Sequence, residues 1–295
     1  MSGEGIALAY DDVTFRYPGS RGDVLSGVSM AFPAGAFALL VGGTGSGKST
    51  LVRMLCALTA PTAGSIEVAG VPVASTGKRG RNVRPKSANR KQLAQLRRHV
   101  GYVMQHPEHQ LFADTVAEDV AYGPRNQGLG ETEVADRVRE SLELLHIGHL
   151  ADRSPFDLSG GQQRLAAIAG VLAMEPECIV LDEATAMLDP VGRREVLSAV
   201  HRLNREKGIT VVLITHHMNE AEDADRVVVM DDGKVIMDGA PRQVFTQVER
   251  LRSMGLTVPD TVDLLDRLRK DGLDVPLTAL TVEECADAIL AAVSK

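Results

Sequence analysis

The chain has 295 residues, enough for one large domain or for one domain with a smaller appendage. A net charge of −7 at pH 7 and an aromatic content of only 3%, without tryptophan, argue against a general affinity for nucleic acid. Since no apolar run approaches the ~20 residues of a membrane span and the N-terminus lacks the pattern of a signal peptide, we expect a cytosolic chain that can still dock on a membrane protein.

Residues 6–35 contain three short β-like segments, at 6–10, 13–17 and 28–32, separated by glycine and proline turns. They predict an antiparallel portion at the start of the chain. Tyr17 ends one of these segments, directly before Pro18 and Gly19. From position alone, we interpret Tyr17 as an edge-strand packing residue.

A glycine-rich segment with the pattern G-x-x-x-x-G-K-[ST] follows an apolar run at residues 37–41. The run predicts a buried strand, the residues after the segment predict a helix, and the two together predict a phosphate cradle of backbone N–H groups. In such a cradle Lys48 reaches the β- and γ-phosphates of a nucleoside triphosphate, and the Ser49 hydroxyl ligates Mg²⁺. The predicted nucleotide-binding residues of this P-loop are Gly42, Gly43, Thr44, Gly45, Ser46, Gly47, Lys48, Ser49 and Thr50.

Two segments of different character follow the helix. Residues 66–73 predict a hairpin around Ala69 and Gly70, whereas residues 78–91 are rich in basic and small polar residues without apolar periodicity. We interpret the second segment as a flexible basic loop. It is either a solvated insertion, the simpler interpretation, or a contact for acidic lipid headgroups or a partner.

The region from about residue 92 to residue 174 is predicted to be mostly helical and inserted between strands of the main sheet. One helix of this region covers residues 131–146, with apolar residues at helical spacing, and Gly148 is expected to close it. Near the start of the region, Gln105 ends a predicted strand. Leu111 and Phe112 then form an apolar tip in a polar stretch, which we expect to line a groove for a partner's helix.

The segment Leu158-Ser159-Gly160-Gly161-Gln162 predicts another helix start, because Ser159 and Gln162 form a capping box. Two glycines in the first turn expose backbone N–H groups, so this helix end is a second phosphate site on the same chain. A merely capped helix explains Ser159 but not the glycine pair.

Polar side chains end two further apolar runs, each of which predicts a buried strand. Asp182 and Glu183 end the first run, and His216 and His217 end the second. Asp182 stands where P-loop proteins hold Mg²⁺, and Glu183 beside it is positioned to orient or deprotonate an attacking water. A histidine at this edge of an α/β sheet lies on the ligand side.

The last part of the chain changes character after about residue 241. Asp232 and Gly233 predict a hairpin just before it, and a capped start at Thr281 predicts a final helix. We therefore predict a main domain over residues 1–245 and a small helical appendage over residues 246–295. Such a tail packs on its own domain or pairs with its copy on a partner.

Taken together, these motifs resemble the ATP-binding subunits of ABC transporters over about residues 6–245. The resemblance implies an α/β fold with a P-loop NTPase core of ABC ATPase type, an antiparallel β subdomain, an inserted helical subdomain and the small C-terminal helical appendage. It also implies ATP hydrolysis, with ATP and Mg²⁺ as cofactors.

The resemblance implies roles for individual residues. Tyr17 resembles the aromatic residue that stacks on adenine, which reverses the packing interpretation. Gln105 resembles the glutamine that senses Mg²⁺ and the attacking water. His216 resembles the switch histidine on the γ-phosphate; His217 is the weaker match, because the family's histidine directly follows the threonine. The implied catalytic residues are Lys48, Gln105, Glu183 and His216. The implied metal-binding residues are Ser49, Gln105 and Asp182. The resemblance also implies that nucleotide is bound by Tyr17, by the P-loop and by the family's signature sequence, which here is Ser159, Gly160, Gly161 and Gln162.

Within this family the sequence is most similar to the ATPase subunits of energy-coupling factor transporters, through residues 105–112, 115–124, 154–157 and 255–259. Ala184, where many members have proline, and the long basic loop are departures. The similarity implies an ATPase that powers uptake of a vitamin or a transition-metal ion. Its implied partners are a second ATPase subunit, the same or a sister chain, in a head-to-tail dimer, an integral membrane subunit and a substrate-binding membrane subunit.

The implied location is the cytoplasmic face of the cell membrane. One alternative is the ATPase of another type of ABC importer, against which residues 154–157 and the tail argue. A second is a soluble ABC ATPase in repair or translation, which would call for a second cassette, a coiled-coil insertion or a basic surface.

Overall fold

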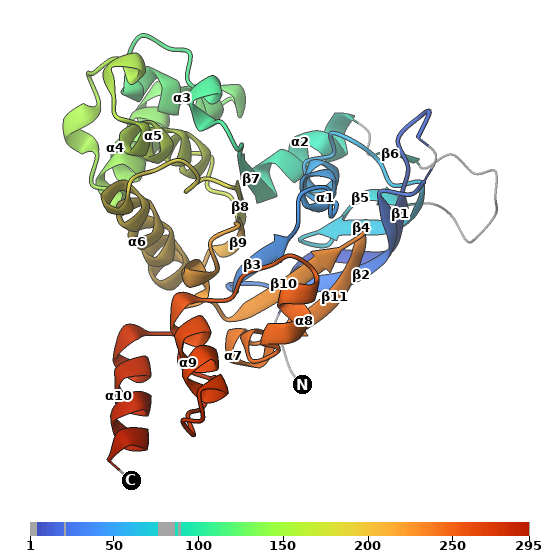
Figure 1. Cartoon of the computed structure of the whole chain (residues 1–295). Helices are drawn as coiled ribbons and strands as arrows, with labels where there is room; N and C mark the ends of the chain where they lie inside the picture. The colour runs from blue at the N-terminus through green and yellow to red at the C-terminus, as the bar shows by residue number, and fades with distance from the viewer. Residues whose placement is uncertain (1–4, 21, 76–85, 88–89, 295) are drawn as a thin grey trace.

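The computed structural model describes residues 5–20, 22–75, 86–87 and 90–294 (Figure 1). The basic loop expected at residues 78–91 lies for the most part outside these ranges. In the part of the chain that the structure describes, none of the helices combines the length and the apolar character needed to cross a bilayer.

The centre of the fold is a six-stranded sheet in the order β11-β10-β3-β9-β8-β7. Its strands are β3 (Phe37–Gly42), β7 (Val100–Val103), β8 (Cys178–Asp182), β9 (Thr210–Ile214), β10 (Arg226–Asp231) and β11 (Lys234–Gly239). All of them run parallel except β11, which forms the expected hairpin with β10. Every residue of β3, β8 and β9 is buried, as expected of parallel strands covered on both faces.

A five-stranded antiparallel sheet of the order β2-β1-β4-β5-β6 packs beside the central sheet. Its strands are β1 (Ile6–Phe15), β2 (Leu25–Pro33), β4 (Ala63–Val68), β5 (Val71–Ser75) and β6 (Lys86–Ser87). The first two segments expected from the sequence are one continuous strand, β1, whose register shifts between Tyr10 and Phe15. The predicted hairpin around Ala69 and Gly70 is confirmed.

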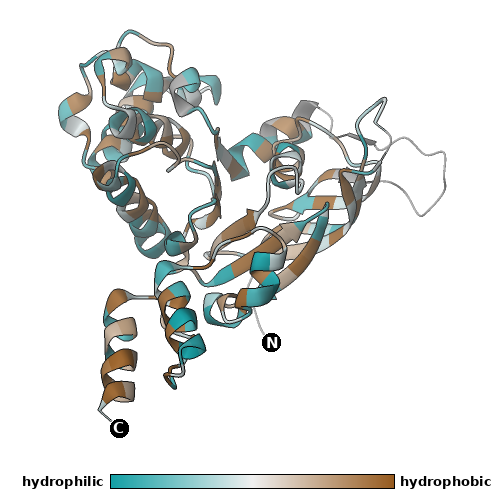
Figure 2. Cartoon of the chain, in the orientation of Figure 1, coloured by the Kyte–Doolittle hydropathy of each residue, from teal (hydrophilic) through white to brown (hydrophobic). Residues whose placement is uncertain are grey.

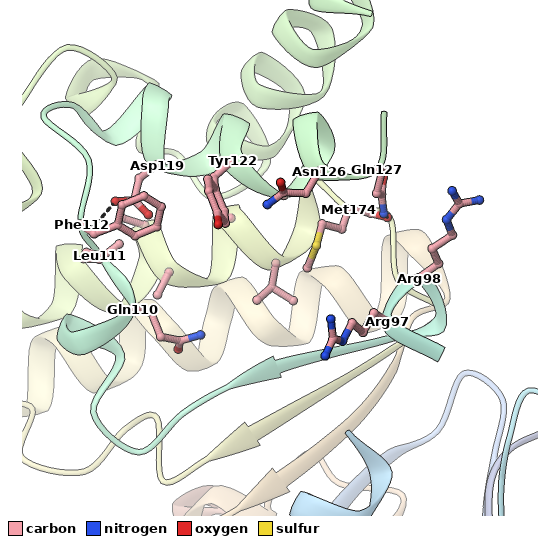
Figure 3. Close-up of a pocket in the computed structure, with 15 residues that line it drawn as sticks. Arg97, Arg98, Gln110, Leu111, Phe112, Asp119, Tyr122, Asn126, Gln127 and Met174 are labelled. Atoms are coloured by element: carbon pink, nitrogen blue, oxygen red, sulfur yellow. Dashed lines mark hydrogen bonds between the residues drawn. The ribbon is translucent and has the colours of Figure 1, made fainter. Parts of the chain in front are cut away.

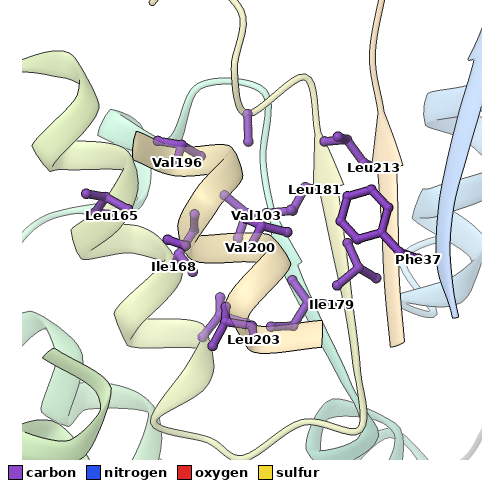
Figure 4. Packing of buried hydrophobic residues seen from close by; sticks show 14 of the residues in the cluster. Phe37, Val103, Leu165, Ile168, Ile179, Leu181, Val196, Val200, Leu203 and Leu213 are labelled. Atoms are coloured by element: carbon purple, nitrogen blue, oxygen red, sulfur yellow. The ribbon is translucent and has the colours of Figure 1, made fainter. Parts of the chain in front are cut away.

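Two hydrophobic cores lie on the two faces of the central sheet, because side chains alternate along each strand. On β3, Ala38 and Leu40 face the core shared with helix α1 (Lys48–Leu55) and the antiparallel sheet. Phe37 and Leu39 face the opposite core, which includes helices α5 (Gly160–Leu172) and α6 (Pro190–Lys207). Figure 4 shows this second core, with Phe37 beside the strands and side chains of α5 and α6 packed against them.

A helical insertion connects β7 to β8 and forms a separate lobe in Figure 1. It contains α3 (Val116–Asn126), α4 (Glu131–Leu144) and α5. Helix α2 (Arg90–His99) instead packs against β5, and β7 belongs to the central sheet. We therefore propose that the helical insertion begins after β7 rather than at residue 92.

The end of α4 differs from the expectation that Gly148 closes this helix. The helix ends at Leu144, and His146 adopts the left-handed conformation with φ 58°. Gly148 instead opens a short 3₁₀ helix. The glycine signal misplaced the helix end because a histidine, a residue that enters the left-handed region more readily than most, makes the turn.

The C-terminal segment is helical, as predicted. It contains α7 (Pro241–Phe245), α8 (Val248–Ser253), α9 (Asp260–Lys270) and α10 (Val282–Val293). Thr281 and Glu284 form a capping box at the start of α10. Helices α9 and α10 share a small core of their own around Leu265 and Cys285, while Figure 2 shows that much of α10 is hydrophobic. The extent of the appendage stays a prediction.

Candidate nucleotide-binding site

The P-loop joins β3 to α1, and close backbone approaches explain two of its glycines. A Cβ atom at Gly42 would lie 2.3 Å from the carbonyl oxygen of Met230. Gly47, the N-cap of α1, has φ 102°, and a Cβ atom there would lie 2.5 Å from the Leu25 side chain. A residue with a side chain would therefore push the loop away from the neighbouring strands and misdirect its N–H groups.

The Lys48 ammonium lies inside the loop rather than in solvent. Its Nζ donates hydrogen bonds to the carbonyl oxygens of Gly42 at 2.7 Å and Gly43 at 3.0 Å, and the residue is 6% exposed. Burial lowers the pKa of Lys48, and the nearby Glu183 and Asp182 carboxylates oppose that shift. A buried ammonium held by neutral carbonyls gains a stronger, charge-assisted partner when a phosphate oxygen replaces them.

Three predicted catalytic side chains converge in front of this loop. His216 Nε2 lies 2.9 Å from Glu183 Oε1, and Gln105 Nε2 donates to Glu183 Oε2 at 2.9 Å. His216 follows β9, Glu183 follows β8 and Gln105 follows β7, so the carboxyl ends of three parallel strands bring the three side chains together. With residues 44–50 and Val24 they line one cavity of about 480 Å³.

The backbone at Glu183 is in an unusual conformation for a residue with a side chain. Its φ is 52°, in the left-handed region, directly after β8 ends at Asp182. The Glu183 N–H donates to Ile214 O at 2.9 Å, and the Ala186 N–H donates to Glu183 O at 2.9 Å. Such backbone strain costs about 1–3 kcal/mol and persists only where the surroundings enforce it, which is typical of functional sites.

The predicted metal ligands have the oxygen donors that Mg²⁺ prefers. Asp182 is 4% exposed and its Oδ2 accepts a hydrogen bond from Tyr102 Oη at 2.9 Å. Burial raises the pKa of Asp182, while the Tyr102 hydrogen bond lowers it. Among the described residues, no group of three or more His, Cys, Asp or Glu could hold an ion by itself. The Ser49 hydroxyl, the Asp182 carboxylate and the Gln105 amide therefore fit an ion that keeps waters and phosphates among its ligands.

Tyr17 lies next to the P-loop helix. Its hydroxyl is 3.2 Å from Thr50 Oγ1, and its ring meets that of Phe15 edge to face with 4.8 Å between centroids. The residue is 38% exposed. The ring is thus packed on Phe15, as position alone predicts, while part of the residue stays exposed.

The signature segment opens α5 with the predicted capping box. The Ser159 N–H donates to Gln162 Oε1 at 3.1 Å, and the Gln162 N–H donates to Ser159 Oγ at 3.3 Å. Gly160 is exposed, but Gly161 is buried, and a Cβ atom there would lie 3.5 Å from Gly192 Cα of α6. Packing against α6 therefore explains one glycine of the pair. None of these four residues is among those that line the P-loop cavity.

Comparison with known proteins identifies the family. The family model described as ABC transporter matches residues 25–186, which is more than half of the chain. The energy-coupling factor transporter ATP-binding protein EcfA1 of Caldanaerobacter subterraneus subsp. tengcongensis is 47% identical over 286 residues, covering 97% of each chain. The chain belongs to the ABC transporter family, among its energy-coupling factor ATP-binding proteins.

Other relatives agree with this assignment. EcfA2 of Geobacillus kaustophilus is 45% identical over 271 residues, 91% of this chain and 90% of that protein. A putative ABC transporter ATP-binding protein of Bifidobacterium longum is 74% identical over 219 residues; the match spans 74% of this chain but 28% of that longer protein.

Two solved structures resemble this ABC protein. CbiO1 of Clostridium perfringens, described as part of the ABC transporter complex CbiONQ, has a TM-score of 0.74 at 34% identity, covering 90% of this chain and 98% of that one. A dimeric ATP-binding cassette in a post-hydrolysis state, bound to ADP and phosphate, has a TM-score of 0.67 at 26% identity, covering 79% and 98%. The predicted fold class and the predicted ABC-type ATPase of the energy-coupling factor kind are thereby confirmed.

Sequence reasoning missed two residues of this ABC protein's site. One is Tyr102 of β7, which donates a hydrogen bond to Asp182. Tyr102 pairs with Val180 of the neighbouring strand β8, and Val180 lies two residues before Asp182, on the same face of that strand. Only the order of the strands reveals that proximity. The other is Glu220, a buried carboxylate after β9 whose partner Thr185 follows Glu183 by two positions.

Proposed function

We propose that this protein binds ATP with Mg²⁺ in the P-loop cavity and hydrolyses it to drive uptake of a vitamin or a transition-metal ion through membrane subunits. The observation that carries the proposal is the convergence of Gln105 and His216 on the two oxygens of Glu183, at the mouth of the cavity that holds Lys48. The names of the relatives support the energy-coupling factor type of transporter.

The geometry supports a division of roles. A carboxylate oxygen accepts more than one hydrogen bond, so Glu183 can hold Gln105 and His216 and still orient a water toward the γ-phosphate. Lys48 and the loop N–H groups neutralise charge that develops on the phosphate oxygens. Ser49, Asp182 and Gln105 would hold Mg²⁺, which would supply further positive charge against the charge that develops on the phosphate oxygens. Tyr17 stacks on the adenine.

We further propose a head-to-tail dimer in which each ATP lies between one P-loop and the other chain's signature segment. The support is that the signature residues do not line the P-loop cavity of their own chain. A solved relative of similar fold is a dimer with ADP and phosphate. Relatives named EcfA1 and EcfA2 both match over most of the chain, so the second subunit is the same chain or a sister chain.

The membrane partner is proposed to dock in a cavity of about 430 Å³ beside Phe112. Leu111 is buried in the core, so the expected apolar tip reduces to Phe112, which is 59% exposed and meets Tyr122 edge to face at 4.8 Å. Figure 3 shows Phe112 and Tyr122 at one end of this cavity and Arg97 and Arg98 at the other. A cavity that is aromatic at one end and basic at the other suits a short helix of an integral membrane subunit.

The location proposed is the cytoplasmic face of the cell membrane, where the partner places the protein. The solved relative CbiO1 is described as part of an ABC transporter complex, which supports an assembly of this kind. Whole-transporter reconstitution tests the function: vesicles that hold the complex should accumulate one labelled vitamin, Ni²⁺ or Co²⁺ only with ATP. Uptake that is independent of ATP would contradict the proposal.

The docking cavity has its own test. Phe112→Asp should leave ATP binding intact and separate this subunit from its membrane partners, because the charge replaces the most exposed apolar contact. The measurement is co-purification from detergent beside an ATP titration. Leu58→Asp, at a residue 63% exposed outside the cavity, is the matched control and should co-purify normally. Normal assembly of Phe112→Asp would reject the cavity.

A further inference from the structure

A buried pair of polar side chains lies behind the site. Thr185 Oγ1 donates a hydrogen bond of 2.7 Å to Glu220 Oε1, and the two residues are 1% and 6% exposed. Among the described residues, the second carboxylate oxygen of Glu220 is buried and has no hydrogen-bond partner. A carboxylate so placed costs desolvation free energy, so this arrangement needs a reason other than stability.

The pair joins the two segments that carry the proposed water-orienting groups. Thr185 is two residues after Glu183, in the turn closed by the bond from the Ala186 N–H to Glu183 O. Glu220 lies in the 3₁₀ turn Met218–Ala221, which begins two residues after His216. The strands before these segments, β8 and β9, are hydrogen-bonded neighbours in the central sheet.

The 3₁₀ turn is also fixed from its other side. Asn219 Nδ2 donates to Asp260 Oδ2 at 2.7 Å, and the Asp260 N–H donates back to Asn219 Oδ1 at 2.8 Å. Asp260 is the first residue of α9. The turn is therefore bonded to helix α9 on one side and to the segment after Glu183 on the other. The bonds to α9 fix the position of Glu220.

We propose that Glu220 is a positioning residue for ATP hydrolysis: through Thr185 it fixes the strained turn that aims Glu183 toward His216 and the P-loop. Glu183 has φ 52°, a conformation that relaxes unless its surroundings hold it. The bonds from the Glu183 N–H to Ile214 and from Thr185 to Glu220 hold the turn at two points. The proposal rests on the role of Glu183 in the proposed function.

The expected kinetic effect falls on turnover and not on ATP affinity. Phosphate contacts come from the P-loop, and neither Thr185 nor Glu220 is among the residues that line its cavity, whereas the water depends on the placement of Glu183. Thr185→Val keeps the shape of the side chain and removes the donor; Glu220→Leu removes the acceptor. A misplacement of about 1 Å costs up to about 10²-fold, so each variant should lower kcat of the assembled transporter by about ten- to 10²-fold. KM for ATP should change less than about threefold.

Two further variants separate positioning from folding. Thr185→Ser and Glu220→Gln keep the donor and the acceptor and should restore most of the turnover. Thr210→Val is the matched control: Thr210 is 1% exposed at the opposite end of β9, and its Oγ1 accepts a hydrogen bond from the Gly35 N–H at 2.9 Å. Thr210→Val should lower the melting temperature of the protein without lowering kcat.

The outcomes distinguish this proposal from the one on which it rests. Wild-type turnover in Glu183→Gln would overturn the role of Glu183 itself. Inactive Glu183→Gln together with wild-type kcat in Thr185→Val would overturn only the role of Glu220. A fall in kcat in Thr210→Val as large as that in Thr185→Val would also overturn it, because loss of stability would then explain both. If the double variant Thr185→Val, Glu220→Leu loses no more activity than either single variant, the two residues act as one unit.

Discussion

The helix starts of α1 and α5, which the sequence predicts as phosphate sites, are built in opposite ways. The start of α1 has no side-chain cap, and the Lys48 ammonium and three polar side chains from strand ends face it. The start of α5 is closed by its own capping box and is exposed at Ser159 and Gly160. The first lines a cavity of about 480 Å³, and the second is an exposed helix end outside that cavity.

The difference lies in which N–H groups remain for a ligand. The capping box on α5 uses the N–H groups of Ser159 and Gln162, and it leaves those of Gly160 and Gly161 to another acceptor. Such a half-satisfied helix end can add two hydrogen bonds to a phosphate but cannot enclose one. We therefore expect the P-loop to bind a nucleotide alone and the signature segment to contribute only when another molecule brings the nucleotide to it.

Removing the carboxylate of Glu183 from the P-loop cavity should give the largest effect on turnover. Glu183→Gln keeps the shape that Gln105 and His216 contact but loses the charge that orients a water, so turnover should fall by about 10²- to 10⁴-fold. ATP affinity should persist. Steady-state phosphate release by the assembled transporter measures this, and Glu195→Gln, an exposed acid on α6, is the charge-matched control. Wild-type turnover would reject the role of Glu183.

A negative charge introduced in the signature segment should distinguish the roles of the two helix starts. A Cβ atom at Gly160 meets only ordinary contacts at 3.7 Å, so Gly160→Asp is tolerated by the fold. The carboxylate would face a phosphate brought by the partner subunit, and like charges across an interface cost several kcal/mol. ATP binding to the single chain should be unchanged, while turnover of the dimer falls by about tenfold or more. Gly160→Ala is the control. Weaker ATP binding by the single chain would show that the signature segment belongs to its own chain's site.

Lys48→Ala changes the helix start at α1 instead of the one at α5. It removes the buried cation from the cavity, and hydrogen bonds to charged groups contribute about 1.5–3 kcal/mol. The Kd for ATP of the single chain should therefore rise by about ten- to 10²-fold in a binding titration, in contrast to Gly160→Asp. Lys234→Ala, at an exposed lysine of β11, should bind normally. Unchanged affinity in Lys48→Ala would contradict the cradle.

The sequence predicted the local features of both helix starts because each is specified by residues close together in the chain. The capping box at Ser159 and Gln162 and the loop around Lys48 are examples. Contacts that depend on the order of the strands could not be predicted from local patterns. An example is the hydrogen bond from Tyr102 of β7 to Asp182 of β8. The end of α4 at Leu144 was misplaced because Gly148 gave a stronger local signal than His146, the residue that makes the left-handed turn.

Burial was the second property that local patterns could not resolve. Leu111 and Phe112 are adjacent and both apolar, yet Leu111 is 6% and Phe112 59% exposed. The difference depends on helix α5, which packs against the 3₁₀ helix Pro107–Gln110 directly before the segment and lies far from it in the chain. Likewise Gly161 contacts Gly192 of α6, a packing role that no spacing within residues 158–162 indicates.

Tyr17 gives the smallest expected effect, and it is the residue for which position and family resemblance disagree. Its ring packs on that of Phe15 and its hydroxyl contacts Thr50 of α1, so part of the residue already has a structural role. The 38% exposure leaves the remainder for adenine, and loss of base stacking costs about 1–3 kcal/mol, of which we expect the lower end. Tyr17→Ala should therefore weaken ATP by roughly fivefold and inorganic triphosphate hardly at all, because phosphate contacts lie in residues 42–50. Tyr17→Phe, which keeps the ring and loses the Thr50 contact, should bind ATP as the wild type does. If Tyr17→Ala binds ATP normally but melts at a lower temperature, Tyr17 is the packing residue that its place in the chain predicts.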